Sequence, residues 1–289
     1  MSASPLPPAP FVHANGAAIP AIGFGTWTLN GERCVEAVGW ALQAGYRHID
    51  TAARYENEVE VGEALRVSGL ARDEIFVTTK VWWTDIAPGA LERSAEASLG
   101  RLGLDQVDLL LIHWPNPAVP LAASTAALCR TRKLGLARHV GVSNYPSAML
   151  DEAVRLASEP LVANQVEYHP FLDQGPVRRA CGRHGMALTA YAPLGRASAV
   201  RDPTLARIAA AHGRSVPQII LRWHMQQPGI VAIPRSGSRE HIVQNLDVFG
   251  FALSDEEMAR ISALARPDGR IIDPDFAPTW DDPSRGPPP

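Results

Sequence analysis

Short runs of apolar and β-branched residues recur along the chain, separated by longer segments with a helical period. Runs of this length, bounded by polar turns, predict buried strands. There are eight, at residues 21–25, 46–50, 75–80, 107–113, 138–144, 163–168, 186–192 and 229–234. The segments between them place apolar residues at i, i+3, i+4 and i+7. This spacing predicts amphipathic helices, as at residues 32–45, 87–103, 147–158 and 215–227.

The regular alternation of strand and helix predicts the fold class. Apolar strands separated by helices are typical of a parallel sheet covered by helices. Eight such units predict an α/β protein with a (β/α)8 TIM barrel, and a doubly wound sheet is the alternative. Glycines that end helical patterns just before a strand support this division, at Gly45, Gly69, Gly103 and Gly185.

The N-terminal part predicts one further element. Residues 11–20 carry an Asn-Gly pair between two short apolar pieces, which predicts a β-hairpin that closes the N-terminal end of the barrel. No change of composition divides the chain after it, so we expect a single domain over residues 11–280. Residues 1–10 and 281–289 are rich in proline and poor in large apolar residues, which predicts disordered tails.

Polar side chains stand where the predicted strands end. Asp50 ends the second strand, Lys80 the third and His113 the fourth. Because the carboxyl ends of barrel strands carry the catalytic groups of this fold, we expect these side chains to share one site. Considered singly, each residue also has a purely structural explanation: Asp50 as a helix N-cap, Lys80 as a surface residue and His113 as a core histidine. The later strands add Ser143, Asn144, Gln165, Glu167 and Tyr191.

Tyr55, five residues after Asp50, indicates the chemistry. A phenol has a pKa of about 10, and a neighbouring ammonium lowers it. We expect Lys80 to lower the pKa of Tyr55, and Asp50 to keep Lys80 charged. His113 would orient a carbonyl oxygen while Tyr55 protonates it and hydride reaches the carbon. Since no side chain supplies hydride, the set predicts a cofactor-dependent carbonyl reductase.

Composition excludes several partners. Lys plus Arg number 27 and Asp plus Glu 30, for a net charge of -3 without a basic stripe, so nucleic acid and anionic membrane are not expected. The sequence has no signal-peptide pattern and no long apolar stretch. Cys34, Cys129 and Cys181 fit neither a disulfide framework nor a zinc site. We expect a cytoplasmic monomer that binds a small molecule and no metal.

Several motifs together resemble the aldo-keto reductase family, over residues from Val12 to Trp280. They are GYRHIDTAARYENE, VTTKVWW, VDLLLIHWP, GVSNY, NQVEYHP, YAPLG and IPRSGSREHIVQNLDVF. The chain is most similar to the bacterial 2,5-diketo-gluconate reductases, which also reduce methylglyoxal and keto esters, and its ending APTWDD resembles theirs. The resemblance implies NADPH-dependent reduction of aldehydes and ketones by a catalytic tetrad of Asp50, Tyr55, Lys80 and His113, with Tyr55 as the acid.

The resemblance also assigns the cofactor site. Ser143, Asn144 and Gln165 would hold the nicotinamide carboxamide, and Tyr191 would stack on the ring. Leu194 and Gly195 would line the pyrophosphate. The adenosine end would lie against Arg235, Ser236, Ser238, Arg239, His241, Gln244 and Asn245. The set is completed by Gly25, Thr26, Trp27, Asp50, Pro193, Ile233, Pro234 and Gly237.

The sequence departs from the family at the adenosine end. Members specific for NADPH commonly carry a basic residue at the positions of Ser238 and His241, and neither is firmly cationic here. Arg235 remains, Ser236 can donate a hydroxyl, and Arg239 either reaches the 2'-phosphate or points into solvent. We therefore expect NADPH to be preferred and NADH to be usable.

Tryptophans would frame the substrate pocket beside Tyr55 and His113, by the same resemblance. The loop after the fourth strand, WPNPAVPLAA, is short, which predicts a pocket with few walls and a broad substrate range. Trp83 fits the pocket and the core equally well. The pocket tryptophans are Trp27, Trp82, Trp83, Trp114 and Trp280.

Other enzyme classes lack their motifs. GFGTWT at Gly23 lacks the third glycine of a Rossmann fingerprint, and no tyrosine is followed four residues later by lysine, as short-chain dehydrogenases require. GxSxG and HExxH are absent. The alternative that stays open is a regulatory subunit of the same fold, which binds the cofactor with little turnover, since fold alone does not decide function.

Overall fold

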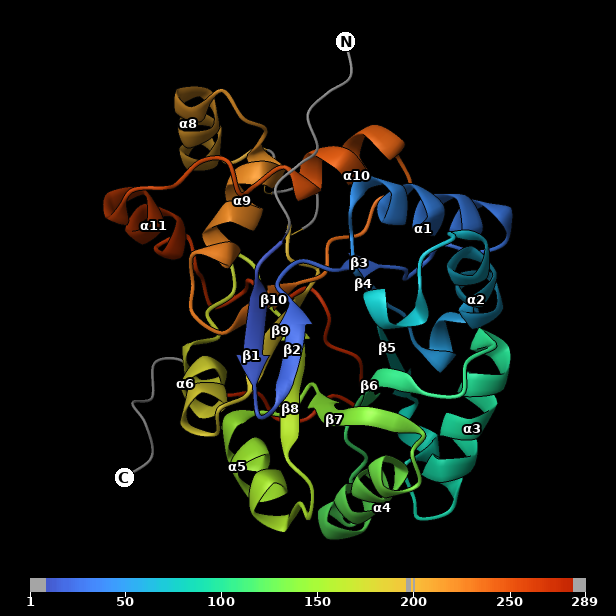
Figure 1. Ribbon diagram of the computed structural model, residues 1–289. Helices are drawn as coiled ribbons and strands as arrows, with labels where there is room; N and C mark the ends of the chain where they lie inside the picture. Colours follow the sequence, from blue (N-terminus) through green and yellow to red (C-terminus); the bar gives the residue numbers. More distant parts are fainter. Residues whose placement is uncertain (1–8, 196–198, 200, 283–289) are drawn as a thin grey trace.

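A parallel sheet lies at the centre of the protein with helices around it, in a computed structural model that describes residues 9–195, 199 and 201–282 (Figure 1). Neighbours in the sheet follow the order of the sequence, and every pair is parallel. The strands are β3 (Phe24–Gly25), β4 (His48–Asp50), β5 (Phe76–Val81), β6 (Val107–Ile112), β7 (Ala137–Ser143), β8 (Leu161–Glu167), β9 (Ala187–Tyr191) and β10 (Ile230–Ala232).

The sheet closes on itself between its first and last strands. Ile22 forms a parallel bridge with Ala232. The amide of Gly23 donates to the carbonyl of Ala232 at 2.8 Å, and that of Gly25 to the carbonyl of Pro234 at 3.0 Å. The prediction of a (β/α)8 barrel is therefore confirmed, and the doubly wound alternative is wrong.

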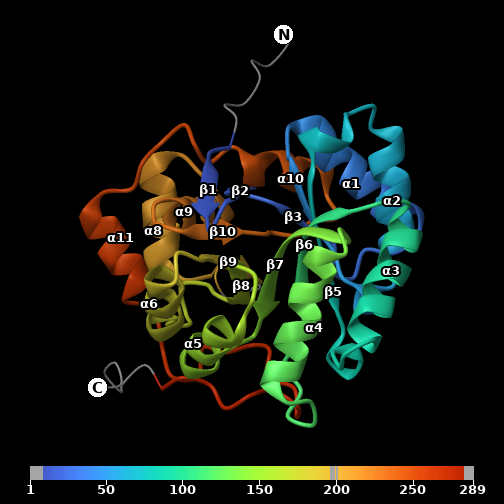
Figure 2. The same cartoon turned by 60° about the horizontal axis from the view of Figure 1, so that its bottom comes forward.

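Helices form the outer layer of the barrel (Figure 2). Each buries an apolar stripe, as α1 does with Cys34, Val38 and Leu42. At the ends of α1 and α3, Gly45 and Gly103 adopt the left-handed conformation, with φ of 112° and 66°, that lets the chain turn back toward the next strand. The helices are α1 (Glu32–Ala44), α2 (Glu58–Val67), α3 (Ala90–Leu102), α4 (Leu121–Lys133), α5 (Ser147–Leu156), α6 (Gly175–Arg183), α8 (Pro203–His212), α9 (Val216–Met225), α10 (Arg239–Leu246) and α11 (Asp255–Ser262).

The predicted hairpin is formed by β1 (Phe11–Ala14) and β2 (Ala17–Pro20), which pair antiparallel. Asn15 and Gly16 in the turn have φ of 45° and 89°, the positive values that a two-residue hairpin turn needs. Asn15 Nδ2 donates to the carbonyl of Leu161 at the start of β8 (2.7 Å) and to that of His184, which follows α6 and precedes β9 (2.9 Å). The hairpin therefore covers the N-terminal end of the barrel, opposite the expected site.

Residues next to both predicted tails contact the folded part of the chain. The carbonyl of Pro10 accepts a hydrogen bond from Ala21 N, and the carboxylate of Asp281 accepts two from Ser147. Residues 10 and 281 therefore have defined contacts. Residues 1–8 and 283–289, on which the prediction of disorder mainly rests, lie outside the described part of the chain.

Candidate active site

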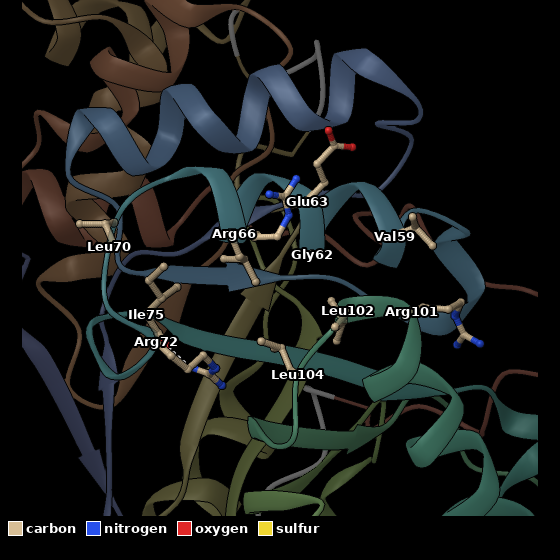
Figure 3. A pocket seen from close by; sticks show the side chains of 12 residues that line it. Val59, Gly62, Glu63, Arg66, Leu70, Arg72, Ile75, Arg101, Leu102 and Leu104 are labelled. Carbon is tan, nitrogen blue, oxygen red and sulfur yellow. Dashed lines mark hydrogen bonds between the residues drawn. The ribbon is translucent and has the colours of Figure 1, made fainter.

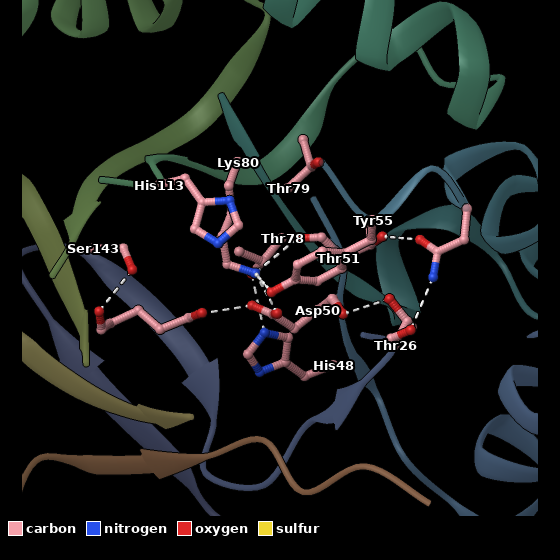
Figure 4. A network of polar contacts seen from close by, with 12 residues as sticks. Thr26, His48, Asp50, Thr51, Tyr55, Thr78, Thr79, Lys80, His113 and Ser143 are labelled. Carbon is pink, nitrogen blue, oxygen red and sulfur yellow. Dashed lines mark hydrogen bonds and ion pairs between the residues drawn. The ribbon is translucent and has the colours of Figure 1, made fainter. Parts of the chain in front are cut away.

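The carboxyl ends of the strands bring the predicted polar residues together. Asp50 is the last residue of β4, Lys80 lies one residue before the end of β5, and His113 follows β6 directly. Figure 4 shows these three side chains converging with Tyr55 at one end of the barrel. Ser143, Gln165, Glu167 and Tyr191 occupy the corresponding ends of β7, β8 and β9. These residues therefore lie at the strand ends at which the sequence pattern places them.

Lys80 is the centre of the hydrogen-bond network. Its ammonium donates to Asp50 Oδ1 at 2.5 Å, to the carbonyl of Thr51 at 2.8 Å and to the Tyr55 hydroxyl at 3.3 Å. The side chains of Lys80 and Asp50 are 0% and 1% exposed. A buried ammonium is tolerated when a carboxylate pairs with it and its donors are used. Lys80 therefore stays charged while it contacts the phenol.

Tyr55 reaches the network because the backbone turns sharply on both sides of it. It is the last residue of the 3-10 helix η1 (Ala53–Tyr55), and Glu56 after it has a left-handed φ of 57°. Asn57 fixes this turn: its Nδ2 donates to the carbonyls of Thr26 (2.9 Å) and Leu29 (2.7 Å). Asn57 was not identified from the sequence as a functional residue, and it positions the phenol without contacting it.

Burial and Lys80 act on Tyr55 in opposite directions. Burial raises the pKa of the phenol, and the charge of Lys80 and its hydrogen bond lower it, but the net pKa stays above the ordinary value. Lys80 therefore lowers the pKa of Tyr55, as expected, but the expectation of a net lowered pKa is wrong. Burial has the larger effect, and the sequence does not show how deeply the phenol is buried. Burial disfavours the Lys80 ammonium, but Asp50 and Tyr55 outweigh it and raise the pKa of Lys80.

His113 faces Tyr55 edge to face, with ring centroids 5.6 Å apart. Burial, with a further contribution from Lys80, lowers the pKa of His113 well below its usual range, so the ring is neutral. Its Nδ1 is buried and has no hydrogen-bond partner among the described residues. A neutral imidazole with one N–H beside an acidic phenol can orient a carbonyl oxygen without competing to protonate it.

The residues assigned to the nicotinamide lie next to this network. Gln165 Nε2 donates to Asp50 Oδ2 at 2.7 Å, and Ser143 Oγ donates to the Gln165 carbonyl at 2.7 Å. Asn144, at a left-handed φ of 63°, donates to the His113 carbonyl and accepts from the Tyr191 hydroxyl. The buried side-chain amides of Gln165 and Asn144 and the buried hydroxyl of Ser143, all beside the phenol, fit the carboxamide of a nicotinamide.

The residues assigned to the adenosine end form a second cluster, between the loop after β3 and α10. Arg235 Nε donates to the carbonyl of Trp27 at 3.1 Å and its Nη2 to Thr28 Oγ1 at 2.5 Å. Ser238 caps α10 by accepting from the amide of His241. Arg235, Arg239 and His241 are exposed. The other assigned residues lie in β3, in the loop after it, in the segment between β10 and α10, and in α10. They are Gly25, Thr26, Ile233, Pro234, Ser236, Gly237, Gln244 and Asn245.

The pyrophosphate segment is described only in part. Pro193, Leu194 and Gly195 follow β9, and the Pro193 carbonyl accepts a hydrogen bond from His224 Nε2 (3.1 Å). Residues 196–198 and 200 lie outside the described part of the chain. The segment therefore starts at the same end of the barrel as the tetrad.

An aromatic cluster packs beside His113, and it contains most of the tryptophans expected to frame the substrate pocket. Trp82 packs edge to face on His113 with centroids 5.2 Å apart, and Trp114 contacts Trp280 at 5.9 Å. Phe276, which sequence reasoning missed, contacts Trp82 and Trp114 and stacks on Trp83. Trp83 thus belongs to this cluster. Trp27 lies outside these ring contacts and is 55% exposed.

The segment after α11 carries Phe276 and Trp280, and the carboxylate of Glu167 holds its first part against the barrel. Glu167, fully buried at the end of β8, accepts hydrogen bonds from the amides of Ile271 (2.7 Å) and Ile272 (2.8 Å). In Figure 2 this red segment passes close to α5, to which Asp281 is bonded. This segment therefore brings Phe276 and Trp280 to the aromatic cluster, in addition to the residues that follow β5 and β6.

A separate hollow lies away from the tetrad, between α2 and α3, with a volume of about 500 Å³ (Figure 3). Its lining includes Val59, Arg66, Leu70 and Leu104 and none of the tetrad.

The described residues contain no group of three or more side chains arranged to hold a metal ion. No helix in the described part of the chain is long and apolar enough to cross a membrane.

Comparison with known proteins agrees with this geometry. The profile of the Aldo/keto reductase family matches residues 21–266. An aldo-keto reductase of Mycobacterium sp. (strain KMS) is 42% identical over 269 residues, which cover 92% of this chain and 96% of that protein. A crystal structure assigned as a 2,5-diketo-D-gluconic acid reductase B is 43% identical, with a TM-score of 0.92 over 94% of this chain and 98% of its own. An aldo-keto reductase from Bombyx mori, in complex with NADP, is 35% identical, with a TM-score of 0.85 over 92% and 96% of the two chains.

Proposed function

Because the chain belongs to the aldo/keto reductase family, we propose that it reduces aldehydes and ketones to alcohols with NADPH, with Tyr55 as the general acid. The observation that carries this proposal is the contact of Lys80 with both Asp50 and Tyr55 beside a neutral His113. When bound, NADPH supplies hydride to the carbonyl carbon.

The residues would divide the work as follows. His113 and Tyr55 hold the carbonyl oxygen between them, and Tyr55 gives its proton to that oxygen as charge develops there. Lys80 stabilises the phenolate that remains, and Asp50 holds the ammonium in place. Gln165, Asn144 and Ser143 would bind the carboxamide, and Tyr191 would stack against the ring.

The geometry supports a broad range of carbonyl substrates. The walls contributed by Trp82, Trp114, Phe276 and Trp280 are flat and apolar, so they discriminate between similar substrates by only about 1–3 kcal/mol per group. We propose methylglyoxal, keto esters, aromatic aldehydes and diketo-sugar acids as substrates. Strict preference for one sugar acid, with the other carbonyls inert, would contradict this range.

A direct test is the oxidation of NADPH by the purified protein with methylglyoxal and with an aromatic aldehyde. Steady turnover that requires the carbonyl is expected. Tight binding of NADPH without turnover of any carbonyl would favour the alternative, a regulatory subunit of the same fold. The intact network around Lys80 argues for the enzyme.

We also propose that the protein is a cytoplasmic monomer. The proposal rests on cysteines that are free and buried, which suits a reducing compartment: Cys34, Cys129 and Cys181. Size-exclusion chromatography with light scattering checks the oligomeric state, and a dimer mass would contradict it.

A further inference from the structure

A cation from the N-terminal part of the chain lies over the adenosine segment. Arg33 is the second residue of α1, and a Cβ built on Gly237 would lie 2.8 Å from its Nη2 and 3.0 Å from its Nε. The guanidinium therefore rests directly on the glycine. Figure 1 shows α1 and α10 side by side, which explains how residues about two hundred positions apart meet here.

The contact depends on glycine at position 237. Any side chain there would have to displace the Arg33 guanidinium, because the space of its first carbon is already taken. A hydrogen bond also connects the C-terminal end of α1 to α10. The hydroxyl of Tyr46, just after α1, donates to the carbonyl of Ile242 in α10 at 3.2 Å. Arg33 thus has a defined place against Gly237.

Burial lowers the pKa of the Arg235 guanidinium, and the charge of the nearby Arg33 lowers it further. Two cations side by side repel each other unless an anion lies between them. Among the described residues, the Arg33 guanidinium has no hydrogen bond and no ion pair. Glu240, the acid of the first turn of α10, is bonded to Gln244 instead (2.9 Å). The cluster therefore holds uncompensated positive charge at the N-terminal end of α10, where the helix dipole also favours an anion.

We propose that Arg33 binds the 2'-phosphate of NADPH together with Arg235 and so sets the preference for NADPH over NADH. Arg235 already gives two of its donors to Trp27 and Thr28, whereas the side-chain donors of Arg33 have no partner in the described part of the chain. Arg33 supplies the charge that Ser238 and His241 do not firmly provide. This assignment rests on the proposed use of NADPH and adds a residue outside the segment from Ile233 to Asn245.

Calorimetric titration of the full-length protein with adenosine 2',5'-bisphosphate and with adenosine 5'-monophosphate tests the proposal without turnover. The two ligands differ by the 2'-phosphate alone. Arg33→Ala should weaken binding of the bisphosphate by about tenfold or more, the loss of one charge-assisted hydrogen bond, and leave the monophosphate unchanged. Arg33→Lys should keep part of the affinity. Arg93→Ala on α3, which removes an equal charge from another exposed helix position, should change neither.

The outcomes separate this assignment from the proposed function. If wild-type protein distinguishes the two nucleotides and Arg33→Ala does so equally well, the assignment of Arg33 is wrong and the use of NADPH stands. Equal loss of both ligands shows that Arg33 stacks on adenine or supports α1, and also overturns the assignment. If wild-type protein does not distinguish them, both the assignment and the proposed preference for NADPH fail.

Discussion

The ammonium of Lys80 lies 2.5 Å from a carboxylate oxygen of Asp50, and both side chains are buried at the end of the barrel. The pair links β4 to β5 and places a fixed positive charge beside Tyr55, 3.3 Å from its hydroxyl. It therefore affects both the chemistry and the stability of the protein, and the two effects can be measured separately.

Tyr55→Phe keeps the ring in place and removes the acid. Carbonyl reduction should fall by about 10² to 10⁴ fold, the usual scale of general acid catalysis, while the affinity for NADPH stays the same. Single-turnover rates and fluorescence titration with NADPH measure the two quantities. Near-normal turnover by this variant would rule out Tyr55 as the acid.

Lys80→Met should lose activity and stability together. Removal of the ammonium leaves the Asp50 carboxylate buried without its counter-ion, which should lower the free energy of unfolding by about 3–5 kcal/mol. The double variant Asp50→Asn/Lys80→Met, with no buried charge, should recover much of that stability in urea titrations while its turnover stays low. Recovery of turnover in the double variant would show that Lys80 has no part in the chemistry.

Acid should destabilise the fold through buried histidines. Burial lowers the pKa of His48 to about 4 and that of His224 to about 3, from 6.5. Below pH 6.5 the unfolded chain takes up protons that the folded chain does not, so the free energy of unfolding should fall as pH drops from 6.5 toward 4. The expected loss is roughly 2–4 kcal/mol for each histidine.

Replacement of one of these histidines provides the control. His48→Gln should show a shallower fall of stability between pH 6.5 and 4 than wild type, although it is less stable at neutral pH through the loss of packing. Urea unfolding at several pH values gives the slope. Parallel curves for the two proteins would show that His48 is not the group responsible.

His241→Arg should sharpen the preference for NADPH over NADH, because it adds a permanent cation at the adenosine end. The ratio of kcat/KM values for the two cofactors measures the preference. An unchanged ratio in His241→Arg would show that position 241 does not face the phosphate.

Glu167→Gln should loosen the wall of the substrate pocket and leave the chemistry intact. An amide offers one acceptor where the carboxylate offers two, so the bonds from Ile271 and Ile272 cannot both persist unchanged. KM should rise by about tenfold, kcat should change little, and hydrogen exchange at residues 271 and 272 should become faster. Glu159→Gln, at a surface ion pair with Arg132, serves as the matched control. Unchanged exchange in Glu167→Gln would contradict this role.

The regular part of the fold could be predicted because each strand and helix carries its own period. The positions of Asp50, Lys80 and His113 followed from the rule that barrel strands present functional groups at their carboxyl ends. Features that depend on distant contacts could not be predicted. Asn57 shows its role only through bonds to Thr26 and Leu29.

Other residues were missed for related reasons. Phe276 lies in a segment without helix or strand, so no period marks which of its residues face the barrel. Arg33 looks like an ordinary surface residue of a helix until α10 is seen beside α1. The net pKa of Tyr55 depends on how much water the folded protein excludes, and the order of residues does not reveal this.

The hydrogen bonds from the amides of Ile271 and Ile272 to Glu167 hold a segment that can change in sequence independently of the tetrad. Tyr55 and its network come from the first half of the chain, whereas Phe276 and Trp280 come from a segment joined to the barrel by a few backbone bonds. Substitutions in that segment can reshape the space offered to a carbonyl compound while the proton donor and its supports stay as they are. New substrate preferences can therefore evolve through substitutions in this segment, while the residues expected to carry out the reaction remain unchanged.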